Sequence, residues 1–404
     1  MHIVIGGGPA GFFAAITARR GDPSTPVLLL EQGAEVLRKV RVSGGGRCNV
    51  THACFDPREL VAHYPRGARE LRGPFHHFGP AETVAWFADL GVALKTEDDG
   101  RMFPVTDDSA TIVAALTDAA DRAGVEVRTR CAVGALRRDA GGFACDLADG
   151  QVLRAERVVL ATGGRTSTGA GPGGYDLARS LGHTIVEPIP SLFTFKCQAP
   201  LLAGLAGVAT GVRVAAAGLD ATGPLLITHK GVSGPAVLRL SAWGARALHG
   251  LGYSFDLTVD WLPDLGDADA LLQQRIRTHG KRGIAGDNPT HLPARLWAAL
   301  VREAGIAEQA RWADLGREPR QRLAAALKAT ILPIAGQTPF KEEFVTCGGI
   351  ALGEVDFRTM ASRVCPGLHL AGEVLDIDGI TGGFNFQNCW TTGWLAGRGT
   401  AGQT

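Results

Sequence analysis

The residues with the clearest chemical meaning lie near the start of the chain. Positions 6 to 11 fit the pattern G-x-G-x-x-G and are Gly6, Gly7, Gly8, Pro9, Ala10 and Gly11. In this pattern the first glycine allows a tight turn, the second lets a pyrophosphate approach the backbone, and the third lets a helix pack closely. Glu31 stands 20 residues after Gly11, where an acid binds ribose hydroxyls and disfavours a 2′-phosphate. The spacing predicts a dinucleotide site.

The elements expected around this run would hold it between two strands. His2 to Ile5 is a short apolar strand, Phe12 to Arg20 is a helix with one apolar face, and Val27 to Leu30 is a second strand that ends at Glu31. The start of such a helix offers free N–H groups to a phosphate. The order strand, glycine turn, helix, strand and acid is the complete arrangement that the pattern requires.

A second glycine cluster follows, and it indicates which dinucleotide is bound. Gly44 to Gly46 stand between Ser43 and Arg47. Such a loop can lay N–H groups against an anion or a planar ring, and Arg47 adds a fixed positive charge. A nicotinamide dehydrogenase has no need of this second loop. A surface turn with a solvated arginine is the alternative interpretation.

The next elements follow the order of a flavin-binding domain. Ser109 to Gly124 is predicted to be an amphipathic helix, capped by Asp108 or Ser109. Strands are expected at 125–133, 143–147, 151–153 and 158–160, with a hairpin turn at Asp149-Gly150. The last strand enters Ala161, Thr162 and Gly163. This order resembles the flavin domains of the glutathione-reductase type, where such a segment covers the cofactor near its phosphates.

The C-terminal stretch supports the same cofactor. Leu368 to Ala371 is an apolar strand followed by Gly372-Glu373, and residues 376–387 read DIDGITGGFNFQ and lead into a helix to about Gly397. In such folds the acid binds the sugar-like chain of the cofactor. The helix start after Gly382-Gly383 would point its positive end at the N1–C2 oxygen edge of the flavin, which favours the anionic reduced form. We therefore expect noncovalent FAD.

Four motifs carry a family resemblance: SGGGRCNVT (43–51), ATGG (161–164), THKGVSGP (228–235) and AGEVLDIDGITGGFNFQ (371–387). They resemble the bacterial BaiN-like, aminoacetone-oxidase-type NAD(P)/FAD-dependent oxidoreductases over essentially the whole chain, and PSLFTF at 190–195 resembles one uncharacterised subgroup. The resemblance implies an α/β fold with a Rossmann-like FAD domain interrupted by a small β-barrel and a helical subdomain. The expected FAD domain is 1–188 with 347–404, the β-rich insert is 189–262 with about 331–346, and the helical part is 263–330.

The resemblance also implies site residues. The matching positions are Gly6, Gly8, Gly11, Glu31, Ser43, Gly45, Arg47, Cys48, Asn49, Gly372, Glu373, Gly383 and Asn385. The other expected cofactor contacts are Pro9, Ala10, Gln32, Lys39, Val133, Ala161, Thr162, Gly163, Asp376, Gly382 and Phe384. The sequence departs from the family at His52, which replaces Asn in a common T-N pair, and at Phe384, which replaces Tyr in a common G-Y-N and therefore lacks the hydroxyl.

Candidates for catalysis are few. Arg47 is the expected source of electrostatic support, and His52 and His229 are the expected proton donors. The alternative for His52 is a structural histidine, and the alternative for His229 is an exposed turn. Cys48 has no C-x-x-C partner, so a structural thiol is favoured over a redox thiol. His76-His77 lacks further ligands at suitable spacing, so no metal site is expected.

Composition excludes several classes of protein. Lys and Arg number 41 against 40 Asp and Glu, so no global field recruits nucleic acid or an anionic membrane. Eight cysteines are too few for a disulfide scaffold, and no long apolar run or signal peptide is visible, so we expect a cytoplasmic protein. Strands and four helices, at 235–249, 267–282, 292–304 and 318–330, are expected in the insert. Residues 267–328 carry a net charge of +4, which a solvated helical face explains.

The function predicted from these observations is FAD-dependent hydride transfer at flavin N5 on a small organic substrate. The favoured direction is NAD(P)H-linked reduction of an activated C=C or carbonyl-conjugated compound. A flavin oxidase of an amine or alcohol, and a flavin-containing RNA- or protein-binding module, remain alternatives. The run GAGPGG at 169–174 follows the A-T-G-G strand and no acid lies at the right distance after it, so NAD(P)H would lack a Rossmann site of its own. The sequence indicates neither the substrate nor the oligomeric state.

Overall fold

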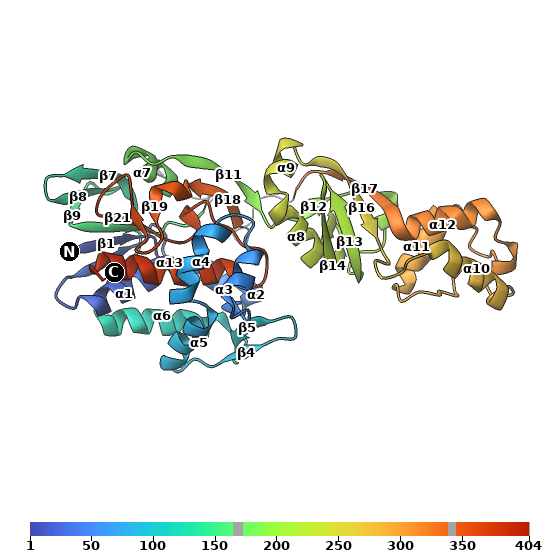
Figure 1. The fold of residues 1–404 in the computed structure, drawn as a ribbon, viewed down its shortest axis with the longest axis horizontal. Helices are drawn as coiled ribbons and strands as arrows, with labels where there is room; N and C mark the ends of the chain where they lie inside the picture. Colours follow the sequence, from blue (N-terminus) through green and yellow to red (C-terminus); the bar gives the residue numbers. More distant parts are fainter. Residues whose placement is uncertain (165–172, 338–344, 404) are drawn as a thin grey trace. The chain divides into compact units, whose positions relative to one another are not determined.

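A computed structural model describes residues 1–164, 173–337 and 345–403, and the chain forms two compact units (Figure 1). One unit comprises Met1–Ser191 with Phe340–Thr404, and the other comprises Leu192–Pro339. The expected run at 169–174 lies for the most part outside the described residues. No described helix is long and apolar enough to cross a membrane.

The first unit is built on a seven-stranded sheet. Its order is β19 (Val355–Asp356), β20 (Ala361–Ser362), β21 (Leu368–Leu370), β10 (Arg157–Leu160), β1 (His2–Ile5), β2 (Val27–Leu30) and β6 (Glu126–Arg128). The five strands from β21 to β6 are parallel. Every residue of β1 and β2 is buried, as expected for parallel strands that are covered on both faces.

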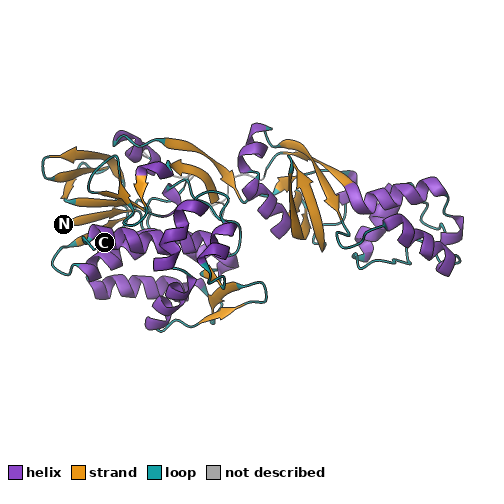
Figure 2. Cartoon of the chain, in the orientation of Figure 1, coloured by secondary structure: helices purple, strands orange, loops and turns teal. Residues whose placement is uncertain are grey.

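Helices cover one face of this sheet and a small sheet covers the other (Figure 2). The helices are α1 (Pro9–Gly21), α6 (Ser109–Ala123) and α13 (Phe384–Thr400), and the small antiparallel sheet consists of β7 (Val133–Asp139), β8 (Gly142–Leu147) and β9 (Val152–Ala155). Glycines bring α1 and α13 together, because a Cβ at Gly393 would lie 2.5 Å from the carbonyl oxygen of Ala10. The sheet thus presents the carboxyl ends of β1, β2 and β10 to the same edge.

Shorter elements complete the first unit. They are α2 (Arg38–Gly46), β3 (Thr51–His52), α3 (Pro57–Leu60), η1 (Val61–His63), α4 (Ala68–His77), α5 (Pro80–Asp89), β4 (Leu94–Thr96), β5 (Arg101–Pro104), α7 (Gly174–Ser180), β11 (Ile185–Ser191), β18 (Val345–Ile350), η4 (Leu352–Glu354) and η5 (Gly372–Val374). Strands β3, β5 and β4 form one antiparallel sheet, and β11 pairs with β18.

The second unit joins an antiparallel sheet to a group of helices. The sheet order is β12 (Phe195–Lys196), β15 (Gly231–Ser233), β14 (Leu219–Thr228), β13 (Ala209–Ala216), β16 (Ser254–Asp260) and β17 (Thr330–Ala335). A bridge between Phe195 and Gln337 links the two edges, so the sheet closes toward a barrel. Helices α8 (Pro235–Trp243) and α9 (Ala245–Gly250) pack beside it, and α10 (Ala268–His279), α11 (Ala294–Glu303) and α12 (Arg317–Ala329) share one hydrophobic core with it.

The α/β fold class is confirmed, with three local corrections. The strand expected at 125–133 is wrong, because Arg130 adopts a φ of 55° and the N–H of Cys131 donates to the Glu31 carbonyl, so β6 ends and β7 begins anew. The helix expected at 235–249 is two helices separated at the non-helical Gly244. The last helix runs to Thr400, beyond the expected end, because Gly397 lets it pack on α1.

Candidate functional site

The turn between β1 and α1 has the shape that a pyrophosphate needs. Gly6 has a φ of 114°, and a Cβ there would lie 2.4 Å from the Ala161 carbonyl oxygen. A Cβ at Gly11 would lie 1.9 Å from the Gly6 carbonyl oxygen, whereas a Cβ at Gly8 would meet nothing within 4 Å. Gly8 is the N-cap of α1 and supplies no side-chain cap. The helix therefore presents open N–H groups with space above Gly8 for an anion.

A cavity of about 460 Å³ opens beside this turn. It is lined by the predicted residues Gly6, Glu31, Gln32, Val133, Thr162 and Gly163. The Glu31 carboxylate accepts from the N–H of Gly7 at 2.8 Å and from the N–H of Gly33 at 2.6 Å, so it is fixed at the end of β2. The Thr162 hydroxyl is a buried group with no hydrogen-bond partner among the described residues. These groups suit the adenosine end of a dinucleotide.

The cavity also includes residues that the sequence did not indicate. Tyr175, Asp176 and Arg179 of α7 line one wall, together with Cys131 and Pro188. Arg179 donates to Asp176 at 2.6 Å across one turn of α7. The only signal in the sequence is the Gly-x-x-Asp pattern that caps α7 at Gly173 and Asp176.

Glu373 lies between three parts of the site. Its carboxylate accepts from Lys39 of α2 at 2.5 Å and from the N–H of Thr346 in β18 at 2.9 Å. The same carboxylate lies 4.0 Å from the position of a Cβ on Gly163. The predicted residues Lys39, Gly163 and Glu373 are thus brought together. Asp376 follows, with its N–H donating to the carbonyl of Ile350.

The start of α13 is held close to the loop that precedes β3. Gly382 and Gly383 have φ values of 134° and 93°, and a Cβ on Gly383 would lie 2.5 Å from the Thr51 carbonyl oxygen. The Asn49 side-chain amide bridges the Thr51 carbonyl and the Gly383 N–H at 3.0 Å each. No side chain caps the helix, so the N–H groups of its first turn remain available. The positive end of α13 can therefore face an electron-rich edge of a ligand.

The triple-glycine loop follows a short helix, and Gly44 and Gly45 are exposed. Residues 38–42 are helical, and Ser43, Gly44 and Gly45 depart from helical geometry. A Cβ on Gly45 or Gly46 would meet nothing within 4 Å, so both leave open space. Cys48 is fully buried, and burial raises the pKa of its thiol to about 12. Cys48 is therefore a protonated thiol at neutral pH.

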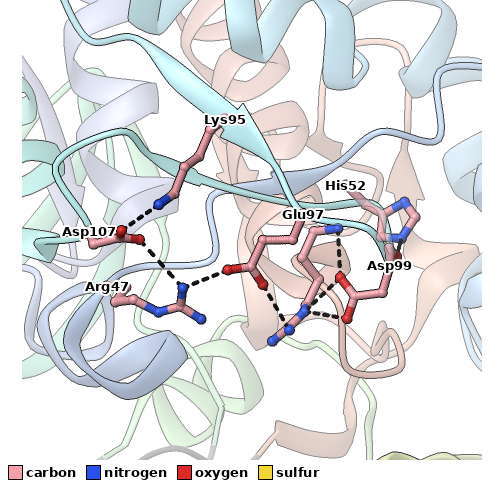
Figure 3. Close-up of polar contacts among 7 residues, drawn as sticks. Arg47, His52, Lys95, Glu97, Asp99 and Asp107 are labelled. Carbon is pink, nitrogen blue, oxygen red and sulfur yellow. Dashed lines mark hydrogen bonds and ion pairs between the residues drawn. The ribbon is translucent and has the colours of Figure 1, made fainter.

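Arg47 belongs to a network of charges along the β3–β5 sheet (Figure 3). Its guanidinium donates to Glu97 at 2.6 Å and to Asp107 at 3.4 Å, and it lies 4.0 Å from the ring centre of Phe103. Lys95 pairs with the same Asp107, and Arg101 pairs with Glu97 and Asp99, so three acids balance three cations there. The hydrogen bond to Glu97 raises the pKa of Arg47 further. Electrostatic support of the cofactor by Arg47 stays a prediction, because these carboxylates neutralise its charge.

His52 lies beside the first residue of α13 and is partly buried. Its Nε2 is 3.0 Å from the Asp99 carbonyl oxygen, which makes Nε2 the protonated nitrogen of the neutral ring. The ring stacks on Phe384 at 4.8 Å, His63 stacks on Phe384 at 4.3 Å, and the centres of the two histidine rings lie 6.0 Å apart. Burial lowers the pKa of His52. The role of His52 as a proton donor stays a prediction.

The other predicted donor, His229, belongs to the second unit. It is exposed in the turn between β14 and β15. Its role in catalysis stays a prediction. No group of three His, Cys, Asp or Glu that could hold a metal occurs among the described residues.

A Ser–His–Glu cluster lies elsewhere in the first unit. His183 Nε2 is 2.9 Å from the Ser362 hydroxyl, and Nδ1 is 2.7 Å from Glu354. The Ser362 oxygen already accepts from the N–H groups of Val364 and Cys365, and the residue is buried. Its lone pairs are occupied, so this cluster ties strand ends together instead of forming a nucleophile.

The comparisons with known proteins agree with this geometry. The 3-dehydro-bile acid delta(4,6)-reductase of Clostridium scindens is 36% identical over 98% of both chains. The ribosomal RNA dihydrouridine synthase of Escherichia coli is 32% identical over 98% of this chain and 96% of that protein. A 3-ketosteroid-delta4-(5alpha)-dehydrogenase from Rhodococcus jostii shares the fold, with a TM-score of 0.53, 17% identity, and coverage of 99% of this chain and 96% of that chain.

The residues present fit FAD. The space above Gly8, the fixed Glu31 carboxylate and the buried Thr162 hydroxyl suit its adenosine diphosphate half, and the open start of α13 suits its ring. The family described as the HI0933-like protein Rossmann domain matches residues 1–399. The chain therefore belongs to the HI0933-like Rossmann-domain family, as the BaiN-like resemblance predicted, and it is an FAD-dependent oxidoreductase.

Proposed function

We propose that this protein is an NAD(P)H-linked reductase that saturates a C=C bond conjugated to a carbonyl. One observation carries the proposal: two full-length relatives with different substrates have names that describe this one reaction. A 3-oxo steroid with 4,6-unsaturation and the uracil ring both present a C=C conjugated to a C=O. The overall reaction adds the hydride of NAD(P)H to the β-carbon and a proton to the α-carbon. When bound, FAD supplies the hydride carrier.

The residues of the first unit support this assignment. The turn from Gly6 to Gly11 and Glu31 would hold the adenosine diphosphate end, and Lys39 and Glu373 lie where the cofactor chain would pass. The uncapped start of α13 would stabilise negative charge on the ring. Since the sequence carries one complete strand–glycine turn–helix–acid pattern, NAD(P)H would react from the face that the substrate later uses.

A second candidate is reduction of uracil within RNA, and one feature of the second unit favours it. Arg277, Lys281, Arg302 and Arg311 are exposed in the helical part and form no salt bridge within the described ranges. Other cations there are paired, such as Arg275 and Arg282, which share Asp287. Exposed, unpaired cations are the groups that bind phosphates in a salt-dependent manner.

The test begins with an anaerobic titration of the FAD-loaded protein with NADPH and then NADH, followed by absorbance. Bleaching by either supports the reductase, and absence of bleaching by both rules out its NAD(P)H-linked form. The reduced protein is next mixed with a 3-oxo-4,6-diene steroid or with a uracil-containing RNA. Return of the flavin absorbance with a product heavier by two hydrogens identifies the acceptor. Turnover with neither, together with turnover of an amine and oxygen, would establish the oxidase instead.

A matched variant separates the two acceptors. Replacing Arg277 and Lys281 by Ser removes two exposed charges without touching the buried Asp287 cluster. If RNA is the acceptor, its reduction weakens and the weakening is largest at low salt. If a small enone is the acceptor, its rate is unchanged by the same two substitutions.

A further inference from the structure

A buried ion pair holds the segment that leads into α13. The Asp378 carboxylate is fully buried, and the Arg66 guanidinium contacts both of its oxygens. The Ser191 hydroxyl donates to Asp378 Oδ2 at 2.6 Å. The backbones of Arg66 and Asp378 also form a β-bridge. Side chains and main chain thus fix the same point, five residues before Gly383.

The residues beside Arg66 hold the next part of this segment. The N–H of Ile380 donates to the His63 carbonyl at 2.9 Å. The Tyr64 hydroxyl, which is buried, donates to the Phe384 carbonyl at 2.6 Å. Residues 63–66 therefore contact the chain at 378, 380 and 384, and they define both the approach to α13 and its first residue.

A second contact makes this segment a closed turn. The Asn385 side chain accepts from the Gly379 N–H at 2.8 Å and donates to the Gly379 carbonyl at 2.9 Å. Because the turn is closed on itself, a shift at Asp378 is passed to the first turn of α13. The N–H groups of that turn carry no side-chain cap and would face the ring of the cofactor when it is bound.

A buried ion pair contributes little to the unfolding free energy of a protein. The free-energy cost of removing two charges from water offsets most of their mutual attraction. A protein with apolar side chains of similar size at the same positions is often equally stable. Burial raises the pKa of Asp378 even though Arg66 acts in the opposite direction. What the pair supplies is geometry, since a bidentate guanidinium–carboxylate contact fixes distance and orientation together.

We propose that Arg66 is a positioning residue that holds the start of α13 through Asp378 and thereby sets the reduction potential of bound FAD. The proposal rests on FAD binding and is independent of the substrate and of NAD(P)H. It concerns a residue that no motif in the sequence indicated. It predicts that loosening this contact weakens the preference of the protein for the reduced cofactor.

The test is the variant Arg66→Lys, which keeps the charge and loses the two-pronged contact. The potential of the FAD-loaded protein is measured anaerobically against a reference dye, without substrate. We expect the ratio of the affinities for reduced and oxidised FAD to fall about tenfold in the variant. This change makes the reduction potential more negative by about 30 mV for a two-electron couple. The matched control is Arg275→Lys, because Arg275 makes the same two-pronged contact with the buried Asp287 in the second unit.

The control variant should keep the potential of the original protein. An unchanged potential in Arg66→Lys would overturn the proposal whatever the FAD dissociation constant, and so would an equal shift in both variants. If Arg66→Lys does not fold, Ser191→Ala removes the hydrogen bond to Asp378 and the 3.3 Å hydrogen bond from Arg66, and it leaves the ion pair in place. It should shift the potential in the same direction by a smaller amount, and no shift in that variant would equally overturn the proposal.

Discussion

Two glycines of the nucleotide turn should respond in opposite ways to the same substitution. A Cβ at Gly8 would meet nothing within 4 Å, and Gly8 has a φ of −87°, which alanine adopts readily. The variant Gly8→Ala should therefore fold as the original protein does, with a change in unfolding free energy of about 0.5 kcal/mol or less. The added methyl would instead fill the space through which a pyrophosphate reaches the helix N–H groups.

The size of the loss follows from the hydrogen bonds at risk. A hydrogen bond to a charged group contributes about 1.5–3 kcal/mol. If the methyl prevents one such bond, FAD affinity falls by about 2 kcal/mol, which is about thirtyfold. At Gly11 the same methyl would lie 1.9 Å from the Gly6 carbonyl oxygen, so Gly11→Ala must displace the turn itself and should destabilise the protein by about 1–3 kcal/mol.

The assay combines urea unfolding of the cofactor-free protein with FAD titration followed by fluorescence. Gly8→Ala should change the affinity and leave the urea midpoint almost unchanged, whereas Gly11→Ala should lower the midpoint. If folded Gly8→Ala binds FAD as tightly as the original protein, the pyrophosphate does not pass over this turn and the reasoning fails.

Three further results are expected. Burial lowers the pKa of His369 from 6.5 to about 4. Between these values the unfolded chain binds more protons than the folded chain, so the unfolding free energy falls as the pH falls, by up to about 3 kcal/mol at pH 4. Urea unfolding at pH 7 and pH 4.5 should show that this pH dependence is weaker in His369→Asn, which can keep the hydrogen bond to the Thr359 carbonyl. Cys48, whose burial raises its thiol pKa to about 12, should resist iodoacetamide at pH 8 in the folded protein and react after unfolding. Mass spectrometry detects the label, and rapid labelling of the folded protein would contradict the burial of this thiol. Thr51→Val should cost about 1 kcal/mol in urea unfolding, because Gln387 loses the 2.6 Å bond from Thr51 and keeps the 3.0 Å bond from Thr83; a neutral result would mean that Thr83 alone satisfies the amide.

Much of the first unit was predictable because its signals are local. The glycines at 6, 8 and 11 are required by backbone conformation and close approach, and the acid at 31 follows directly from the end of a buried strand. The same holds for Asp108, which caps α6 by accepting from the N–H of Ala110. The bound nucleotide and the fold class could therefore be inferred from neighbouring residues alone.

The parts that the sequence did not indicate depend on residues far apart in the chain. Arg66 meets Asp378 across 312 positions, and Lys39 meets Glu373 across 334. Arg47 and His52 were singled out for their types, yet Arg47 is paired with Glu97 and Asp107, and His52 is partly buried with its Nε2 bonded to the backbone carbonyl of Asp99. Spacing along the chain carries no information about which carboxylate will neutralise a cation.

The sequence by itself determined that this protein binds a dinucleotide and has an α/β fold, because turns, caps and strand periodicity are set within a few residues. The tertiary structure alone decided which polar groups are neutral, which are buried and which are held in place by ion pairs or hydrogen bonds. Asp378 is an ordinary acid in the sequence and becomes a fully buried anchor only where β11, residues 63–66 and the approach to α13 come together. Burial and pairing are properties of the packed chain, and they determine the charge that each side chain presents to the cofactor.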